Sequence, residues 1–202
     1  MILLDTLETY TEPDDSYKIF PIIYSRCSVQ DEIFKDTNFV NEIHDLENYK
    51  SISKYNFRYE WKKYDHLFYN HIDSKIKSQK NQILEFFWQE KLFQNIWAGT
   101  SLPKLQSITD VFVTLQCFQP GFIGMNPHLD NRRICIQFVV NLIDNSESTE
   151  IFSYKNQHQP IIHAPIKKLT GIGFANTAGS IHNIGPVSSK RLTLYFGISL
   201  NG

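Results

Sequence analysis

The sequence predicts an α+β fold in which helices cover one face of a β-sandwich or barrel. Before about residue 100, apolar residues recur at helical spacing, whereas runs of β-branched and aromatic residues separated by turn residues follow residue 108. Short strands with turns between them are typical of sandwiches and barrels, and helices that precede such a sheet most naturally cover one of its faces. Neither an internal repeat nor a low-complexity linker interrupts the 202 residues, so we expect a single domain.

Residues 1–107 are expected to be mixed and then mainly helical, and to support the sheet. Residues 18–24 (KIFPIIY) resemble a short strand near a sheet edge, because a proline interrupts them. Residues 31–48 carry apolar side chains at helix-like spacings. The strongest helical pattern covers residues 78–97, and Gly99 just beyond it is a stop signal.

Residues 108–202 are expected to form the core sheet. The first β-branched and aromatic run ends at a Gln-Pro-Gly turn, and similar runs follow it to the end of the chain. The predicted strands are residues 111–118, 133–143, 150–154, 159–163, 171–175, 180–184 and 191–200.

Composition and charge exclude several classes of protein. A net charge of −1 argues against a sequence-independent grip on nucleic acid, although a nucleobase substrate is not excluded. The 3 cysteines show no C-x-x-C spacing, so we expect neither a disulfide framework nor a cysteine-ligated zinc site. The N-terminus turns acidic at once, and no stretch approaches the ~18 apolar residues of a membrane span. We therefore expect a soluble cytoplasmic protein.

Two H-x-D triplets could contribute metal ligands. With 7 histidines and 21 acidic residues, about one H-x-D or H-x-E triplet is expected by chance, so the pattern alone is weak. On a strand, residues i and i+2 point the same way and can bind one ion, whereas on a helix they diverge by roughly 200°. The His71-Ile72-Asp73 triplet lies in a helix-like stretch, which favours a solvated polar pair. The His128-Leu129-Asp130 triplet lies between a turn and a strand, where a chelating pair is geometrically feasible.

A second histidine and an arginine follow at positions that complete an iron site. Two imidazoles and one carboxylate, here His128, Asp130 and His182, are the ligand set of non-haem Fe(II) oxygenases. In the strand that follows, Arg191 and Thr193 alternate with apolar residues and therefore share one face. An inward arginine is costly unless an anion neutralises it, and that anion is either an internal acidic residue or a bound carboxylate.

Neighbouring residues leave alternatives open. His163 is another candidate for the distal ligand, but no arginine follows it on an alternating strand, so a polar surface role is favoured. Arg132 and Arg133 directly follow the metal motif. Either could bind an acid group of a substrate, or both could face solvent at the end of a strand, and the sequence favours neither interpretation.

Taken in order, these motifs resemble the core of the Fe(II)/2-oxoglutarate-dependent dioxygenase superfamily. The H-x-D triplet, the distal histidine and an R-x-T triplet that begins nine residues later all appear in family order. Residues 139–142 (VVNL) resemble the family's strand after H-x-D, and residues 165–174 resemble its approach to the distal histidine. The resemblance covers roughly residues 110–200. One departure is the segment 148–152 (STEIF), where many members have Gly-Gly-x-Leu.

The resemblance implies a double-stranded β-helix (jelly-roll or cupin-like) core at residues 108–202, with the N-terminal helices packed on one sheet. It implies that Fe(II) binds to His128, Asp130 and His182, which would be the catalytic residues. Because position 130 carries a carboxylate rather than a small residue, the resemblance favours oxygenation over halogenation.

The resemblance also implies the co-substrates. 2-Oxoglutarate would bind through its distal carboxylate to Arg191 and Thr193, dioxygen would be the second co-substrate, and ascorbate would serve as the reductant in vitro. The expected reaction is hydroxylation of an unactivated C–H bond in a small molecule or in a residue of a peptide or protein, with release of succinate and CO₂.

Three other functions remain open. One is a nucleobase demethylase of the same superfamily, which the near-neutral charge disfavours. Another is a non-catalytic metal-binding jelly-roll module, either a sensor or a structural unit, which would have no reason to keep a buried arginine. A zinc hydrolase with the same three ligands would leave Arg191 without a role and would need a general base that the sequence does not reveal. Neither the substrate nor the oligomeric state is predicted.

Overall fold

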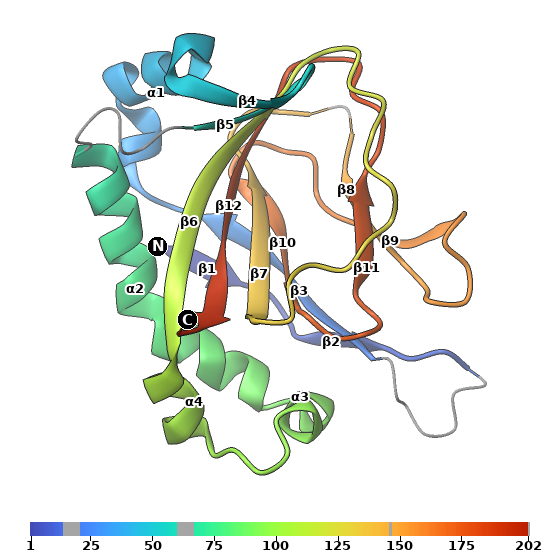
Figure 1. The fold of residues 1–202 in the computed structure, drawn as a ribbon. Coiled ribbons are helices and arrows are strands. Elements are labelled where there is room, and N and C mark those ends of the chain that lie inside the picture. The colour runs from blue at the N-terminus through green and yellow to red at the C-terminus, as the bar shows by residue number, and fades with distance from the viewer. Residues whose placement is uncertain (14–20, 60–66, 146, 202) are drawn as a thin grey trace.

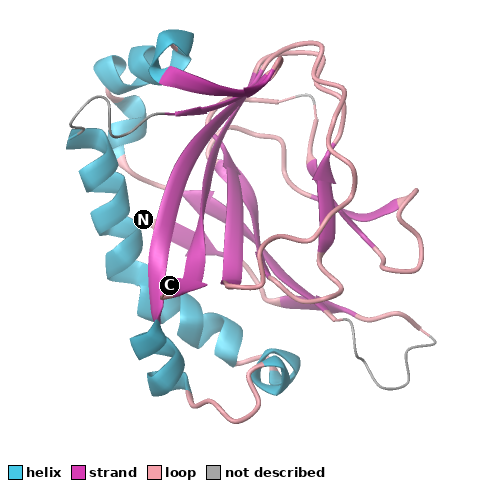
Figure 2. Ribbon diagram, viewed as in Figure 1, coloured by secondary structure: helices cyan, strands magenta, loops and turns pink. Residues whose placement is uncertain are grey.

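The computed structural model describes residues 1–13, 21–59, 67–145 and 147–201. Two antiparallel sheets face each other, and the helices lie on the outer side of the larger one (Figures 1 and 2). Within the described residues, no helix is both long enough and apolar enough to cross a membrane.

The larger sheet contains strands from both halves of the chain. Its strands are β1 (Ile2–Leu4), β2 (Glu8–Tyr10), β3 (Ile22–Val29), β4 (Tyr49–Ser53), β5 (Asn56–Tyr59), β6 (Thr109–Phe118), β7 (Ile134–Asn141), β10 (Thr170–Ala175) and β12 (Arg191–Leu200). They lie in the order β1-β3-β10-β7-β12-β6-β5-β4, and β2 also pairs with β3. The smaller sheet has the order β11-β8-β9 and consists of β8 (Thr149–Phe152), β9 (Pro160–His163) and β11 (Ile181–Ile184).

One long helix covers the outer face of the larger sheet. The helices are η1 (Glu32–Lys35), α1 (Thr37–His44), η2 (Leu46–Asn48), α2 (Leu67–Trp88), α3 (Lys91–Ile96) and α4 (Leu102–Ile108). Figure 1 shows α2 running along β6 and β12. Its buried residues Ile72, Ile76, Ile83 and Phe87 recur at helical spacing and belong to the main apolar core. The predicted arrangement, with helices on one sheet, is confirmed.

The side chains of β12 alternate between the two faces of the larger sheet. Leu192, Leu194 and Phe196 belong to the apolar core beneath α2. Arg191 points the other way and contacts Thr149 on β8 of the smaller sheet. The predicted alternation is therefore confirmed, and its polar face lines the space between the two sheets.

The predicted strands of the second half agree with the structure to within two residues at every end, whereas the predicted helices are too continuous. Residues 78–97 belong to two helices, α2 and α3, because the side chain of Glu90 accepts a hydrogen bond from the backbone N–H of Leu92 and begins a new helix. Residues 31–48 form η1, α1 and η2. Asp36 and Asp45 separate them, and each caps the helix that follows.

Other elements of the first half are not evident in the sequence pattern. The strand predicted at residues 18–24 begins at Ile22, and residues 14–20 lie outside the described part of the chain. It pairs with β10 on one side and with β1 and β2 on the other, so it lies one position inside the edge. Strands β1, β2, β4 and β5 were not predicted. The larger sheet therefore continues across the predicted boundary at residues 107 and 108.

Candidate functional site

The central feature of the site is a pair of histidines joined through the backbone. His128 lies in the segment before β7, and His182 lies on β11. The backbone N–H of each residue donates to the carbonyl of the other, with both N–O distances at 3.0 Å. The imidazole rings lie side by side, with centroids 4.7 Å apart. This isolated bridge holds two segments of distant sequence in a fixed register.

Backbone carbonyls orient both rings in the same way. Nδ1 of His128 lies 2.9 Å from the carbonyl oxygen of Asn126, and Nδ1 of His182 lies 2.9 Å from that of Ser180. A carbonyl accepts but does not donate, so each Nδ1 carries the proton and each Nε2 keeps its lone pair. Both Nε2 atoms are thus free to act as metal ligands.

Asp130 completes the cluster. Its Oδ1 lies 3.7 Å from Nε2 of His128, and its Oδ2 lies 3.4 Å from Nε2 of His182. One ligand atom from each of the three residues lies within 4.8 Å of the other two. The structure therefore brings together the three side chains that the sequence selected as metal ligands, and two nitrogens with one carboxylate oxygen suit Fe(II) or Zn²⁺.

Hydrogen bonding keeps Asp130 ionised. Burial raises the pKa of this carboxyl, but the neighbouring imidazole of His182, followed by the hydroxyl of Tyr195 and the imidazole of His128, outweighs burial, so the pKa lies below its ordinary value. The Tyr195 hydroxyl donates to Oδ2 of Asp130 over 2.9 Å. Burial, followed by the charge of Asp130 and this hydrogen bond, raises the pKa of Tyr195 well above its ordinary value, so the phenol stays protonated and remains a donor.

A cavity of about 310 Å³ opens beside the three side chains. Its polar lining includes Tyr195, Asn183 and Gln116, and Arg58 on β5 provides a positive charge. The full lining consists of Arg58, Gln116, Met125, His128, Asp130, Asn131, Ile134, Val139, Thr149, His182, Asn183, Ile184 and Tyr195. The cavity is large enough for a small organic molecule or the side chain of a peptide.

Arg191 is buried behind one wall of this cavity, with only 1% of its surface exposed. Its guanidinium donates to the backbone carbonyl of Glu147 at 3.2 Å and to the hydroxyl of Thr149 at 2.8 Å, and its Nε has no hydrogen-bond partner. Burial lowers the pKa of Arg191 to about 10, although the charges of Glu147 and Glu150 oppose the change. Arg191 is therefore a buried cation at neutral pH.

Thr193 lies beside Arg191 on the same face of β12. It is fully buried, and its hydroxyl has no hydrogen-bond partner. Neither residue lines the cavity, but Thr149, which accepts a hydrogen bond from Arg191, does. Arg191, one of the two predicted carboxylate-binding residues, is thus linked to the cavity through the side chain of Thr149.

The remaining candidate residues lie elsewhere. Arg132 and Arg133 are exposed in the turn before β7, and neither lines the cavity. His163 is exposed on β9, where its Nδ1 lies 3.3 Å from the hydroxyl of Ser148 and 3.7 Å from Glu150. It does not contact the three-residue cluster.

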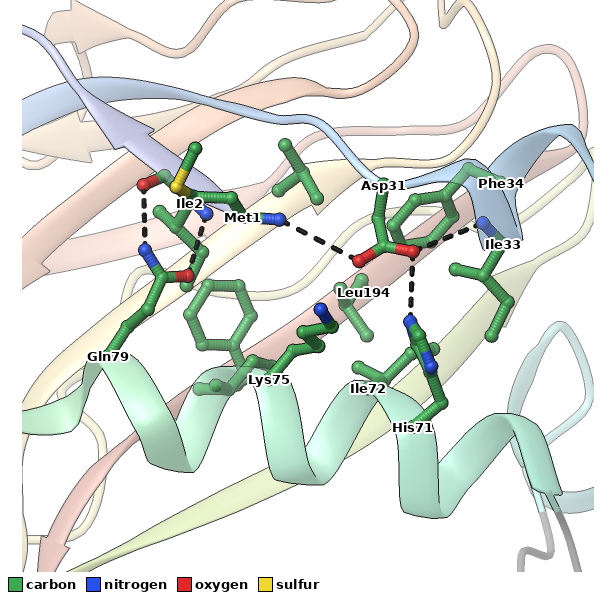
Figure 3. Close-up of a pocket in the computed structure, with 13 residues that line it drawn as sticks. Met1, Ile2, Asp31, Ile33, Phe34, His71, Ile72, Lys75, Gln79 and Leu194 are labelled. Carbon is green, nitrogen blue, oxygen red and sulfur yellow. Dashed lines mark hydrogen bonds and ion pairs between the residues drawn. The ribbon is translucent and has the colours of Figure 1, made fainter.

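The other H-x-D triplet does not form a metal site. On α2, Nε2 of His71 lies 2.9 Å from Oδ1 of Asp31, as Figure 3 shows, in the wall of a pocket of about 20 Å³. Asp73 instead pairs with Lys77, one helical turn later, at 2.8 Å. Because the two side chains have different partners, they do not act on one ion, as the helical geometry predicts.

Sequence reasoning missed several residues of the site. Tyr195 follows Arg191 and Thr193 on the inward face of the same strand, so the alternation could have pointed to it. Arg58 and Thr149 gave no such signal, because they reach the site through strand pairing with distant segments.

Comparison with solved structures reveals a shared fold. The structure of a prolyl-4-hydroxylase from Pseudomonas putida superposes with a TM-score of 0.58 at 10% sequence identity, and the match covers 89% of this chain and 93% of that chain. This chain has the fold of that hydroxylase. At this identity the likeness concerns the fold alone, and it agrees with the predicted double-stranded β-helix class.

Two further structures are similar at lower scores. A viral collagen prolyl hydroxylase from Paramecium Bursaria Chlorella virus-1, in complex with 2OG, gives a TM-score of 0.49 at 15% identity, covering 89% of this chain and 96% of that one. A 2OG-Fe(II) oxygenase family member from Burkholderia pseudomallei gives 0.47 at 11% identity, covering 97% and 73%. No family model matches the sequence, and no curated protein matches it.

Proposed function

We propose that this protein is an Fe(II)- and 2-oxoglutarate-dependent oxygenase that hydroxylates a C–H bond of a small molecule or of a residue in a peptide or protein. The arrangement of His128, Asp130 and His182 carries the proposal, because their ligand atoms lie within 4.8 Å of one another beside a cavity. The buried cation Arg191 and the fold shared with a prolyl-4-hydroxylase support it.

The three side chains fit a ferrous ion chemically. Each imidazole is held by its Nδ1 proton, so Nε2 needs no change of tautomer to bind a metal. Asp130 is ionised at neutral pH and brings one negative charge. Two neutral nitrogens and one carboxylate leave further coordination positions open to co-substrates.

Arg191 and Thr193 fit a carboxylate. The buried guanidinium donates to a carbonyl and a hydroxyl, and the charges of Glu147 and Glu150 only partly offset its burial, since its pKa is still lowered to about 10. An entering carboxylate could replace the Thr149 hydroxyl as the acceptor, and the orphan Thr193 hydroxyl could donate to it as well. The distal carboxylate of 2-oxoglutarate has the charge and shape for this position.

Bound ferrous iron, with 2-oxoglutarate and dioxygen, supplies an oxidant strong enough to break an unactivated C–H bond, and succinate and CO₂ are the co-products. The protein's own part is to hold the three ligand side chains rigidly and to bind the co-substrate carboxylate. Val139 and Ile184 add apolar surface to the otherwise largely polar lining of the cavity beside this centre.

The proposal is tested by a screen for succinate formation. The protein is incubated with Fe(II), ascorbate and 2-oxoglutarate and with panels of small molecules and peptides, and succinate and oxidised products are measured by mass spectrometry. His182→Ala should abolish both metal binding and succinate formation, because it removes a ligand. His163→Ala, an exposed histidine on the same sheet, is the matched control and should behave like the wild-type protein.

The competing functions give different results in the same experiment. A non-catalytic module would bind iron through the three ligands without forming succinate on any panel. A zinc hydrolase would release hydrolysed products without consuming 2-oxoglutarate. Full activity in the His182→Ala variant would disprove the ligand assignment.

A further inference from the structure

A short polar chain leads from the interior of the larger sheet to Asp130. The hydroxyl of Tyr195 lies 2.9 Å from Oδ2 of Asp130 and 2.9 Å from Oε1 of Gln137. Tyr195 is on β12 and Gln137 is on the neighbouring strand β7. Gln137 is fully buried, so its amide has no access to water.

The direction of this chain follows from counting protons. A phenol has one proton and cannot donate to two acceptors at once. The Nε2 of Gln137 has no hydrogen-bond partner, although Oε1 faces the phenol. Exchanging the two nearly identical ends of the amide lets Nε2 donate to Tyr195, so that the single phenol proton goes to Asp130. The chain therefore runs from Gln137 through Tyr195 to Oδ2 of Asp130.

Packing holds the phenol in this position. The ring of Tyr195 lies against that of Phe112 on the adjacent strand β6, with centroids 5.3 Å apart. Its backbone pairs with both β6 and β7. A side chain that is fixed by two strands, an aromatic neighbour and a buried amide can in turn fix the carboxylate that it touches.

We propose that Tyr195 is a positioning residue that occupies Oδ2 of Asp130, so that Oδ1 alone is offered to a metal ion, and that Gln137 orients Tyr195. In the described residues no hydrogen bond reaches Oδ1, which lies 3.7 Å from Nε2 of His128. The inference rests on the metal site of the proposed function. A carboxylate that binds through one oxygen leaves one more coordination position free than a carboxylate that binds through two, and this site needs every free position for its co-substrates.

Cobalt binding tests the role without requiring a known substrate. Co(II) is titrated anaerobically into the wild-type protein and Tyr195→Phe, and its affinity and visible absorption are measured. Tyr195→Phe should weaken Co(II) binding about 10- to 100-fold, the usual effect of losing a hydrogen bond to a metal ligand. The absorption of bound Co(II) should also change, because it depends on coordination number. Finally, 2-oxoglutarate should bind less tightly to the cobalt-loaded variant.

Two further variants complete the test. Tyr24→Phe removes a phenol that donates to Glu8 outside the site, so it should leave Co(II) binding unchanged. Gln137→Leu should weaken Co(II) binding in the same direction as Tyr195→Phe, because the phenol loses its orientation. Circular dichroism and the melting temperature establish that each variant is folded.

The cobalt titration separates the role of Tyr195 from the existence of the metal site. The metal site stands if the wild-type protein binds Co(II) and His182→Ala does not. If folded Tyr195→Phe then matches the wild-type protein in affinity and in absorption spectrum, the positioning role of Tyr195 is wrong. If Gln137→Leu also has no effect, its orienting role is wrong. If the wild-type protein binds no Co(II), the metal site and the role of Tyr195 both fall.

Discussion

At the scale of single residues, Arg191 stands out because it is a fully buried cation, and a buried charge is costly unless an anion neutralises it. The alternation of polar and apolar residues in β12 predicts that Arg191 faces inward. It does not indicate whether the compensating negative charge comes from the protein or from a ligand. In the structure it donates to the backbone carbonyl of Glu147 and to the hydroxyl of Thr149, and the charges of Glu147 and Glu150 only partly offset its burial. An incoming carboxylate would therefore gain a desolvated partner.

Replacing Arg191 should separate co-substrate binding from metal binding. Arg191→Met keeps much of the side-chain volume and removes the charge, so 2-oxoglutarate should bind the cobalt-loaded protein at least about 30-fold more weakly. Thr193→Val should weaken it about 10-fold, because it removes one hydrogen bond to a charged group. Calorimetry measures both. Arg26→Met, an exposed arginine on β3, is the control, and equal affinities in all four proteins would place the carboxylate elsewhere.

Arg58 provides a residue-scale prediction about the substrate. Although Arg132 and Arg133 were the sequence candidates for contacting an acid group, Arg58 is the arginine that lines the cavity. Strand pairing aligns it with Gln116 and, through that residue, with Thr193, so these side chains belong to the same face of the sheet. Arg58→Gln should therefore reduce succinate formation more with acidic compounds than with their amides. An equal loss for both members of each pair would argue against an ionic contact.

At the scale of elements, two glycines in β10 permit close packing against β7. A Cβ atom at Gly171 would lie 2.0 Å from the backbone carbonyl oxygen of Val139, and one at Gly173 would lie 2.1 Å from the ring of Phe138. Gly171 meets backbone, which cannot rotate away, whereas Gly173 meets a side chain. Strand β7 begins four residues after Asp130, so this packing also supports the site.

Gly171→Ala should therefore lower the free energy of unfolding by about 1–3 kcal/mol, the usual effect of overpacking. Urea denaturation measures the change. Gly185→Ala is the matched control, since a Cβ atom there would have no heavy atom within 4 Å, and it should change stability by less than about 0.5 kcal/mol. A Gly171→Ala variant as stable as the wild-type protein would mean that β7 and β10 can separate without cost.

At the scale of the whole molecule, the interior protects the thiols. Cys27, Cys117 and Cys135 are buried, and burial raises the pKa of Cys27 to about 12, that of Cys135 to about 12 and that of Cys117 above its ordinary value. The native protein should therefore resist alkylation at neutral pH, since the thiolate is the reactive form. Mass spectrometry should find all three modified only after denaturation, and rapid labelling of the native protein would show that the core opens readily.

The local pattern of apolar and polar residues was sufficient to predict the strands of the second half and the side chains that face inward from β12. In a strand, alternate side chains point to opposite faces of the sheet. When one face must pack against a helix, the apolar residues take that face and the residues between them take the other. The candidate ligand residues were selected from the order of the motifs along the chain, and strand geometry supported only the pairing of His128 with Asp130.

The way in which those side chains act together depends on contacts between segments that are distant in the sequence. The orientation of both imidazoles depends on the carbonyls of Asn126 and Ser180, and Oδ2 of Asp130 accepts a hydrogen bond from Tyr195 on another strand. Arg58 reaches the cavity because β5 pairs with residues of β6 that lie about 60 positions later in the chain. These contacts join segments that are far apart in the sequence, so a local pattern cannot predict them. They form only when the chain folds and brings those segments together.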